Sequence, residues 1–401
     1  MKIVEINGNN YASVGNIMLN IAKNARNQGF EVFTCCKNSR KSQEFHYDNQ
    51  IYIGSRIERV ISEYLANITG YSGSFNYIGT KLFINKLKKI KPDLIHLHVM
   101  HDTYINLSML FKYIKDNNIP VVWTFHDCWA FTGKCPYFER CDCFKWEKEC
   151  HNCPQIKEYP QSFFFDKTKY LWNKKKELFT SIDNLTVVTP SIWLKKYVEK
   201  SFFNKYRVDV INNGINLDIF KPIESDFRDK NNLNDKYIIL GVGYNWTKRK
   251  GLNTFIELSK RLSSKYQIIL VGTNDEIDKL LPSNIISIHR TYNQEELAKL
   301  YTAADLFVNP TIEENFPTVN IEALACGTPV LTYNTGGSPE IIDETCGDVV
   351  EKNDIDTLTK QIKNICENHK YNKQACLIRA SKFDMNDKFN DYVDLYKEIL
   401  G

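Results

Sequence analysis

Two glutamates, Glu314 and Glu322, are separated by seven residues in a segment that predicts the start of a helix. Pro317 suits the first turn of that helix, and Gly327 suits its C-terminal cap. Glu314 should therefore lie in the loop that enters the helix, with Glu322 about one turn inside it. Helix N-termini attract anions, and carboxylates accept hydrogen bonds from paired hydroxyls. The set fits a sugar nucleotide, although a capping glutamate followed by a solvated one would have the same spacing.

Three successive cations, Lys248, Arg249 and Lys250, follow the predicted strand at 237–243 and precede Gly251. A glycine-punctuated turn between a strand and a helix that carries such cations suits a diphosphate. The same cations would stabilise the negative charge that grows when a diphosphate leaves. A solvated basic loop is the alternative interpretation.

In the first half of the chain, His126 and Asp127 stand directly after the apolar run VVWTF. Ligands of open α/β sheets bind at the carboxyl ends of the strands, so we expect His126 to point into a cleft. There it could hydrogen-bond a sugar hydroxyl or shield charge, whereas a purely structural histidine is the alternative. His96, His98 and His101 end the preceding strand, but they are sequence neighbours that cannot all face the cleft, and we set them aside.

Six of the twelve cysteines fall between residues 128 and 153. Cys150 and Cys153 have the spacing of a zinc knuckle, and Cys135 with Cys141 or Cys143 would complete four ligands. We predict a structural zinc on Cys135, Cys141, Cys150 and Cys153, because the surrounding loop has little apolar content to hold it together. Free thiols are the alternative. A nucleic-acid-binding finger is disfavoured, because no helix here presents base-reading residues.

Apolar runs alternate with amphipathic stretches along the whole chain, which is typical of parallel sheets covered by helices on both faces. The segment 7–16, NGNNYASVGN, predicts a small-residue loop after the first strand. It lacks G-x-G-x-x-G, which argues against a dinucleotide-dependent dehydrogenase. We predict an α/β chain of two Rossmann-like, doubly wound domains facing a cleft, at 1–212 and 213–381, with a cysteine-rich insertion at 128–155 and a final helix at 382–401.

The block E-N-F-P-T-V-N-I-E (314–322), followed by A-L-A-C-G-T-P-V and G-G-S-P-E, resembles the donor site of the family-four retaining glycosyltransferases, which have the GT-B fold. The resemblance implies that Glu322 binds the nucleotide ribose and that Glu314 lies beside the transferred sugar and phosphate. Lys250-Gly251 matches the phosphate-binding element of the family. Tyr244 stands where the family usually has an arginine, so Arg249 is the candidate replacement.

The same resemblance implies that the first loop approaches the donor phosphates, that a histidine lies beside the reacting sugar, and that the last helix returns to the first domain. The implied catalytic residues are His126, Glu314 and Lys250. The implied donor-binding residues are Gly15, Asn16, Arg249, Lys250, Glu314, Asn315, Phe316, Pro317, Thr318 and Glu322.

The expected activity is transfer of a hexose-type sugar, with retention of configuration and without a metal at the donor site, from a UDP- or GDP-sugar. T-G-x-C and C-x-x-C-P resemble an insertion of bacterial surface-polysaccharide transferases, which implies a glycan or polyprenyl-diphosphate-linked acceptor. A nucleotide-sugar epimerase or hydrolase of the same fold is one alternative. A non-catalytic sugar-nucleotide-binding subunit is the other.

The formal net charge of +4 gives no global field that would call for nucleic acid. Lysines mixed with aromatic residues at 81–91 and 163–176 suit an anionic membrane surface, or else form solvated helix faces. The start, MKIVEING, predicts a strand rather than a signal peptide, and no stretch approaches the ~20 apolar residues of a spanning helix. We expect a cytoplasmic protein that is at most peripheral on the membrane.

Overall fold

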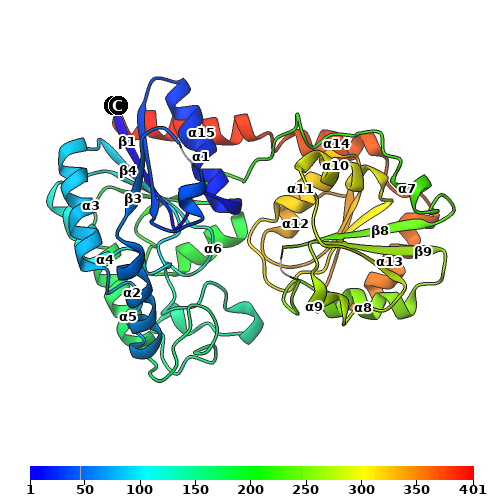
Figure 1. Cartoon of the computed structure of the whole chain (residues 1–401), viewed down its shortest axis with the longest axis horizontal. Helices are drawn as coiled ribbons and strands as arrows, with labels where there is room; N and C mark the ends of the chain where they lie inside the picture. Colours follow the sequence, from blue (N-terminus) through cyan, green and yellow to red (C-terminus); the bar gives the residue numbers. More distant parts are fainter. Residues whose placement is uncertain (46, 245) are drawn as a thin grey trace. The chain divides into compact units, whose positions relative to one another are not determined.

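The computed structural model describes residues 1–45, 47–244 and 246–401. They form two compact units: unit 1 comprises residues 1–211 and 389–401, and unit 2 comprises residues 212–388. Each unit holds one parallel β-sheet with helices on its two faces (Figure 1). The prediction of two doubly wound α/β sheets is confirmed.

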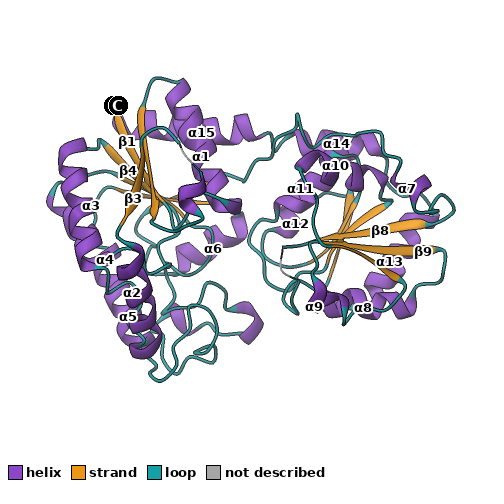
Figure 2. Cartoon of the chain, viewed as in Figure 1, coloured by secondary structure: helices purple, strands orange, loops and turns teal. Residues whose placement is uncertain are grey.

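Unit 1 contains a seven-stranded sheet in the order β3-β2-β1-β4-β5-β6-β7. The central strands β4 and β5 are buried along their whole length. This is expected of a parallel sheet with helices on both faces, which Figure 2 shows. The strands are β1 (Lys2–Ile6), β2 (Glu31–Lys37), β3 (Gln50–Ile53), β4 (Leu94–Leu97), β5 (Val121–Thr124), β6 (Leu185–Thr189) and β7 (Arg207–Val210). The helices are α1 (Ala12–Asn27), α2 (Arg56–Thr69), α3 (Tyr77–Ile90), α4 (Leu107–Asp116), α5 (Thr168–Phe179) and α6 (Ile192–Lys200), with 3-10 turns η1 (Ser42–Glu44), η2 (Glu139–Cys141) and η3 (Lys145–Glu147).

The first helix begins earlier than the sequence predicts. The amphipathic pattern begins at Ile17, but α1 starts at Ala12, so Gly15 and Asn16 lie in the helix and not in the loop before it. A Cβ on Gly15 would come within 2.9 Å of the Asn10 carbonyl carbon, so glycine lets the loop pack closely against the first turn. The expected loop at 7–16 is therefore limited to the residues before Ala12.

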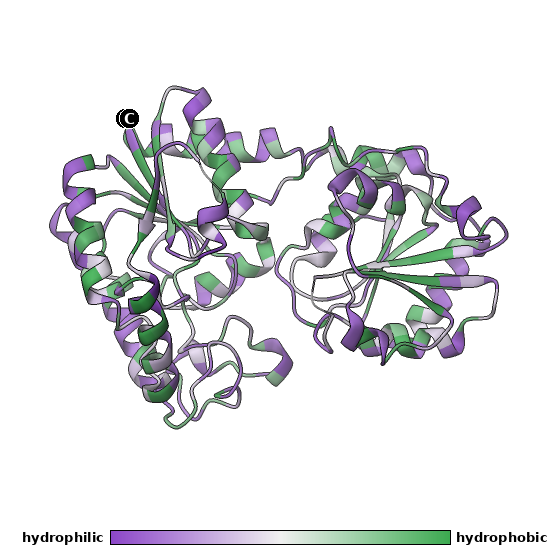
Figure 3. Cartoon of the chain, in the orientation of Figure 1, coloured by the Kyte–Doolittle hydropathy of each residue, from purple (hydrophilic) through white to green (hydrophobic). Residues whose placement is uncertain are grey.

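Unit 2 contains a six-stranded sheet in the order β10-β9-β8-β11-β12-β13. Its apolar strands lie between two layers of helices whose outer faces are hydrophilic (Figure 3). The strands are β8 (Tyr237–Val242), β9 (Tyr266–Val271), β10 (Ile285–Ile288), β11 (Leu306–Asn309), β12 (Val330–Tyr333) and β13 (Gly347–Val350). The helices are α7 (Phe227–Lys230), α8 (Leu252–Arg261), α9 (Asp275–Asp278), α10 (Gln294–Ala303), α11 (Thr318–Ala325), α12 (Ser338–Ile341), α13 (Ile355–Glu367) and α14 (Lys373–Ser381).

The last helix, α15 (Met385–Leu400), packs on unit 1, as predicted. Tyr392 and Tyr396 are buried there, and the Tyr396 hydroxyl lies 2.5 Å from Nδ1 of His96. Asn390 accepts hydrogen bonds from the side chains of Asn24 and Gln28 on the first helix. Buried hydroxyls with partners fix the register of this helix as well as its position.

The insertion after β5 contributes buried aromatic residues to the hydrophobic core of unit 1, so the expectation of little apolar content was wrong. Phe131, Phe138 and Trp146 are almost fully buried, and the Trp146 ring contacts the other two with centroids 4.8 and 5.0 Å apart. Lys134 donates to the carbonyls of Gln155, Ile156 and Glu158 and closes the end of the segment. Hydrophobic burial and these hydrogen bonds contribute to holding the insertion in place.

Across the described parts of the chain, the helices are all too short or too polar to traverse a lipid bilayer.

Candidate active site

The candidate site of unit 2 lies at the carboxyl ends of its strands, where ligands of open α/β sheets bind. A pocket of about 520 Å³ opens there, beside the first turns of α11. Its wall combines backbone from three strand ends with Glu322 and a small set of polar side chains. The lining residues are Val242, Gly243, Tyr244, Val271, Gly272, Thr273, Asn274, His289, Arg290, Thr291, Leu297, Val319 and Glu322.

Lys250 and Glu314, which are 64 residues apart in sequence, form an ion pair with Nζ 2.5 Å from Oε2. Backbone bonds tie the two loops together, because Ile312 N donates to Arg249 O and Gly251 packs against Pro310. Gly251 has φ +83°, and a Cβ there would come 2.5 Å from the Pro310 carbonyl oxygen. Only glycine allows this approach, so the Lys250-Gly251 pair is fixed by backbone geometry as well as by charge.

Electrostatics keep Glu314 ionised. Burial alone would raise the pKa of its carboxyl, but Lys250 and Arg249 more than offset this and lower the pKa below its usual range. Lys250 is likewise held beside a negative charge before any ligand binds. An anionic phosphate that enters the site would compete with Glu314 for the Lys250 ammonium.

Glu322 lies in the second turn of α11 and reaches the pocket wall. Burial raises the pKa of its carboxyl to about 7, while hydrogen bonds from Tyr301 and Thr318 pull it partly back. The Tyr301 hydroxyl donates to Oε2 over 3.1 Å. A carboxylate has about four lone-pair positions, so with these two donors it can still accept from a pair of ligand hydroxyls.

The other predicted residues around Glu314 hold the loop in place. Arg249 donates from Nη1 to the Glu313 carbonyl, and Gly337 N donates to the Asn315 carbonyl. Phe316 is buried against Phe383, while Pro317 precedes the first turn of α11 and Thr318 begins it. Asn315 and Phe316 therefore shape the site through backbone and packing, and Arg249 uses at least one guanidinium N–H to support the loop.

Several pocket residues were missed by the sequence analysis. Gly272, Thr273 and Asn274 follow β9, and Arg290 and Thr291 follow β10. The sequence carries a signal for them, because each group lies at the carboxyl end of an apolar run, at 266–271 and at 285–288. Arg290 adds a cation near the pocket that none of the sequence motifs contained.

In unit 1, His126 follows β5 and is half-buried, next to Asp127. Its Nε2 lies 3.1 Å from Nδ1 of His98, a residue that the sequence analysis set aside. Burial lowers the pKa of His126 to about 4, although Asp127 acts in the opposite direction. Asp127 in turn accepts a hydrogen bond over 3.1 Å from Nε2 of His101. His126 is therefore neutral at physiological pH.

The predicted zinc ligands do not form a compact set. Cys135, Cys150 and Cys153 are close enough to influence each other's pKa, and Cys143 acts on all three as well. Among the described residues, the cysteines make no group of three sulfurs within 4.8 Å of one another, whereas sulfurs around zinc lie ~3.8 Å apart. Gly133 N donates to the sulfur of Cys150. The thiols would therefore have to move to surround a tetrahedral ion, and zinc on these residues stays a prediction.

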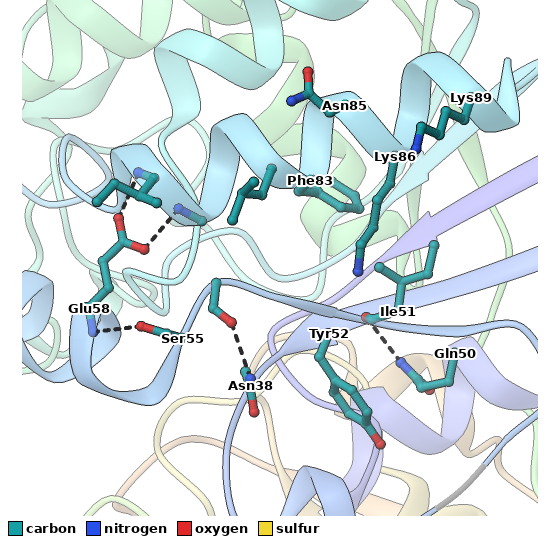
Figure 4. A pocket seen from close by; sticks show the side chains of 14 residues that line it. Asn38, Gln50, Ile51, Tyr52, Ser55, Glu58, Phe83, Asn85, Lys86 and Lys89 are labelled. Atoms are coloured by element: carbon teal, nitrogen blue, oxygen red, sulfur yellow. Dashed lines mark hydrogen bonds between the residues drawn. The ribbon is translucent and has the colours of Figure 1, made fainter.

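A second groove, of about 750 Å³, lies along the edge strand β3 and α3 (Figure 4). The Glu58 carboxylate accepts from the backbone N–H groups of Ile78 and Gly79, and so caps the start of α3. Lys86 and Lys89 border the other end of the groove. Among the described residues that line it, Glu58 is the one carboxylate and there is no histidine, so we place the active site elsewhere.

Two family models match the chain. The model described as "Glycosyltransferase Family 4" matches residues 14–219, and "Glycosyl transferases group 1" matches residues 223–382. A putative colanic acid biosynthesis glycosyl transferase of Escherichia coli (strain K12) is 24% identical over 293 residues, which is 71% of this chain and 69% of that protein. An uncharacterized 41.2 kDa protein in the cps region of Klebsiella pneumoniae is 26% identical over 82% of this chain and 84% of its own length.

Solved structures share the fold of the whole chain. A sucrose-phosphate synthase from Thermosynechococcus elongatus has a TM-score of 0.73 at 19% identity, covering 99% of this chain and 98% of that one. HepE from Anabaena, in complex with UDP, has a TM-score of 0.71 at 15% identity over 99% and 100% of the two chains. A complex of HepE with UDP-glucose is also similar, with a TM-score of 0.69.

The fold, the candidate site and the comparisons together define the protein as a glycosyltransferase (EC 2.4) of the GT-B type. The chain belongs to glycosyltransferase family 4, whose members use nucleotide-sugar donors.

Proposed function

We propose that the protein transfers a hexose-type sugar, with retention of configuration, from a nucleotide-diphosphate sugar to a glycan or polyprenyl-diphosphate-linked acceptor of surface polysaccharide. The observation that carries the proposal is the Lys250–Glu314 ion pair in the loop that leads into α11, the helix whose Glu322 lines the pocket. The relatives named for colanic acid biosynthesis and a cps region support the polysaccharide pathway. The HepE complexes favour UDP as the nucleotide.

In this proposal unit 2 binds the donor and unit 1 presents the acceptor. Glu322 accepts from the ribose hydroxyls, and Lys250 leaves Glu314 to bind the donor diphosphate. Glu314 is then released to hold hydroxyls of the transferred sugar. His126 hydrogen-bonds the reacting sugar from unit 1, with Gly15 and Asn16 near the phosphates.

The chemical step breaks the bond between the anomeric carbon and the phosphate oxygen. The acceptor oxygen forms a new bond to that carbon on the same face, and its proton passes to the leaving phosphate. Lys250 stabilises the negative charge that grows on the diphosphate, which is the interaction that gains most in the transition state. The proposal requires no metal at the donor site.

A thermal-shift screen against UDP- and GDP-sugars tests donor binding, because a ligand at 100 times its Kd stabilises a protein by about 2.7 kcal/mol. The donor that stabilises the protein is then incubated with it, alone and together with lipid-linked acceptors, and the products are analysed. The products distinguish a transferase from a hydrolase, an epimerase or a non-catalytic subunit. Turnover of donor without an acceptor at the full rate would favour a hydrolase or epimerase. Binding without any turnover would favour a non-catalytic subunit.

We also propose that unit 1 rests on anionic membrane, where a lipid-linked acceptor resides. Helix α2 has its apolar stripe on the solvent side: Ile57 is 75% exposed, whereas Ser62 and Ala66 are buried. Phe163 N donates to Asn67 O, which brings an exposed run of three phenylalanines to the end of this helix. The exposed apolar residues of this surface are Ile57, Val60, Ile61, Tyr64, Leu65, Tyr77, Ile78, Leu82, Phe163, Phe164, Phe165 and Tyr170.

Exposed lysines at 81–91, with Lys169 and Lys176 on α5, flank this apolar surface, which supports an anionic bilayer as its partner. Vesicle co-sedimentation of Ile57→Ser/Phe164→Ser should fall well below that of the natural chain. Tyr292→Ser, which removes an exposed aromatic ring from unit 2, is the matched control. Equal binding to neutral vesicles, or the same loss in the control, would count against the proposal.

A further inference from the structure

The open edge of the unit 1 sheet carries backbone groups that are available for pairing. β3 is the edge strand, and its neighbour in the described sheet is β2. Thr34 N donates to Asn49 O. Asn38 N donates to Ile53 O, so the odd-numbered residues of β3 face β2. The N–H and C=O of Tyr52 therefore point outward, and among the described residues neither has a hydrogen-bond partner.

The groove of about 750 Å³ along β3 gives this edge room for a ligand. Helix α3 forms its opposite wall, as Figure 4 shows. The part of α3 that lines the groove runs from Ile78 to Lys89, which corresponds to a rise of about 17 Å. An extended chain covers the same length with about five residues. The groove therefore matches a short strand laid between β3 and α3.

Cations without acidic partners stand at one end of the groove. Lys86 and Lys89 are exposed there, and neither forms an ion pair with any residue that the structure describes. In Figure 4 the Lys86 side chain extends from α3 toward Ile51 of β3. At the other end, each carboxylate oxygen of Glu58 already accepts from a backbone N–H of α3. The uncompensated charge of the groove is therefore positive, and it favours an acidic ligand.

A peptide in strand conformation uses both features, because its backbone pairs with the sheet edge while its side chains reach the helix. We propose that the groove between β3 and α3 is a docking site for an extended, acidic segment of a partner protein, which adds an eighth strand to the seven-stranded sheet. Main-chain hydrogen bonds to Tyr52 provide affinity, and carboxylates against Lys86 and Lys89 select the segment.

Two other occupants fit the groove less well. A second copy of the chain would bring two sets of Lys86 and Lys89 to one edge, and lysines on sheet edges oppose such pairing. An anionic lipid would suit the lysines, and Ile78 and Leu82 also belong to the apolar surface proposed to face the membrane. Its phosphate can accept from the Tyr52 N–H but has no donor for the Tyr52 carbonyl, whereas a peptide backbone supplies both groups.

Peptide selection followed by hydrogen exchange tests the proposal on the full chain. Random displayed peptides of about nine residues, longer than the groove requires, are selected on the natural chain, and the enriched peptide is synthesised. We expect it to carry acidic residues and to slow amide exchange of Tyr52 by at least about tenfold. The N–H groups of Ile51 and Ile53 already face β2, so their exchange is the internal control and should not change.

Two double variants of α3 test the charge requirement. Lys86→Glu/Lys89→Glu should weaken binding of the selected peptide by at least about tenfold. Lys81→Glu/Lys88→Glu reverses two exposed lysines of the same helix that do not line the groove, and it should retain the binding. Unchanged exchange of Tyr52, or an equal loss of binding in the two double variants, would overturn the proposal.

The same exchange measurement distinguishes the other occupants. Protection of Tyr52 by phosphatidylglycerol vesicles but not by the peptide would assign the groove to lipid and overturn the proposal. Protection that grows with the concentration of the chain alone would assign it to a second copy and overturn the proposal as well. None of these measurements needs transferase activity, so failure of the proposed function would leave the docking site intact.

Discussion

Replacement of Glu322 by glutamine should stabilise the ligand-free protein while weakening its binding of the donor. The carboxyl has a pKa of about 7 in the folded protein, against 4.5 for an ordinary glutamate. The unfolded chain therefore ionises first as pH rises. The stability associated with protonated Glu322 is fully present below pH 4.5 and is lost progressively until pH passes 7.

The size of the effect follows from the difference between these pKa values. A tenfold change in proton affinity corresponds to 1.36 kcal/mol, so ionised Glu322 costs at most about 3 kcal/mol above pH 7. Glu322→Gln does not titrate. The free energy of unfolding of Glu322→Gln, relative to that of the natural chain, should grow by about 2 kcal/mol between pH 5.5 and pH 7. It should be constant above pH 8.

Urea unfolding of the two proteins at pH 5.5, 7 and 8 measures this difference. Glu295→Gln, which removes an exposed carboxylate from α10, is the control for loss of charge alone. Donor titration at pH 8 should show a raised KM for Glu322→Gln with a nearly unchanged kcat, the mark of uniform binding. If Glu322→Gln gave no gain in stability at pH 8, the reasoning on burial would be refuted.

Three further outcomes are expected. Lys250→Ala should lower kcat by on the order of 10²–10³-fold, and Glu314→Gln should lower it similarly when donor is saturating. A near-normal kcat in both variants would contradict the assignment of Lys250 and Glu314 to the active site. Removal of residues 389–401 should damage folding of unit 1, because Tyr396 is buried there, so a stable and active truncation would argue against this packing. If the insertion binds zinc, elemental analysis of protein purified without added metal should find close to one zinc per chain. Only a small fraction of one zinc per chain would contradict the prediction.

The repeated units of the fold were predictable, because buried parallel strands are unbroken apolar runs that can be seen in the sequence. The start of α1 was not, because Ala12 and Gly15 belong to a helix whose first turn carries no apolar period. The aromatic core of the insertion was missed for a similar reason. Phe131, Phe138 and Trp146 follow neither a helical nor a strand period, so only the folded loop reveals that they meet.

The candidate site was accessible mainly through the resemblance. Spacing alone could not bring Lys250 to Glu314 across 64 residues, since nothing local encodes which strand ends are neighbours in the sheet. His98 was set aside because three histidines on one strand end cannot share a direction. In a strand, however, alternate residues share a face, and His98 turned out to be the one in contact with His126.

The central claim is that Lys250 binds the donor diphosphate and that Glu322 binds the ribose. Calorimetric measurement of UDP and uridine binding to three variants tests this claim most directly. Lys248 stands on the same turn as Lys250 but is exposed, so Lys248→Ala matches Lys250→Ala in charge. We predict that Lys250→Ala weakens UDP binding at least tenfold and leaves uridine binding unchanged, while Lys248→Ala changes UDP binding less than twofold. Glu322→Gln should weaken both ligands. Equal effects of the two lysine variants, or uridine binding that is indifferent to Glu322→Gln, would contradict the account.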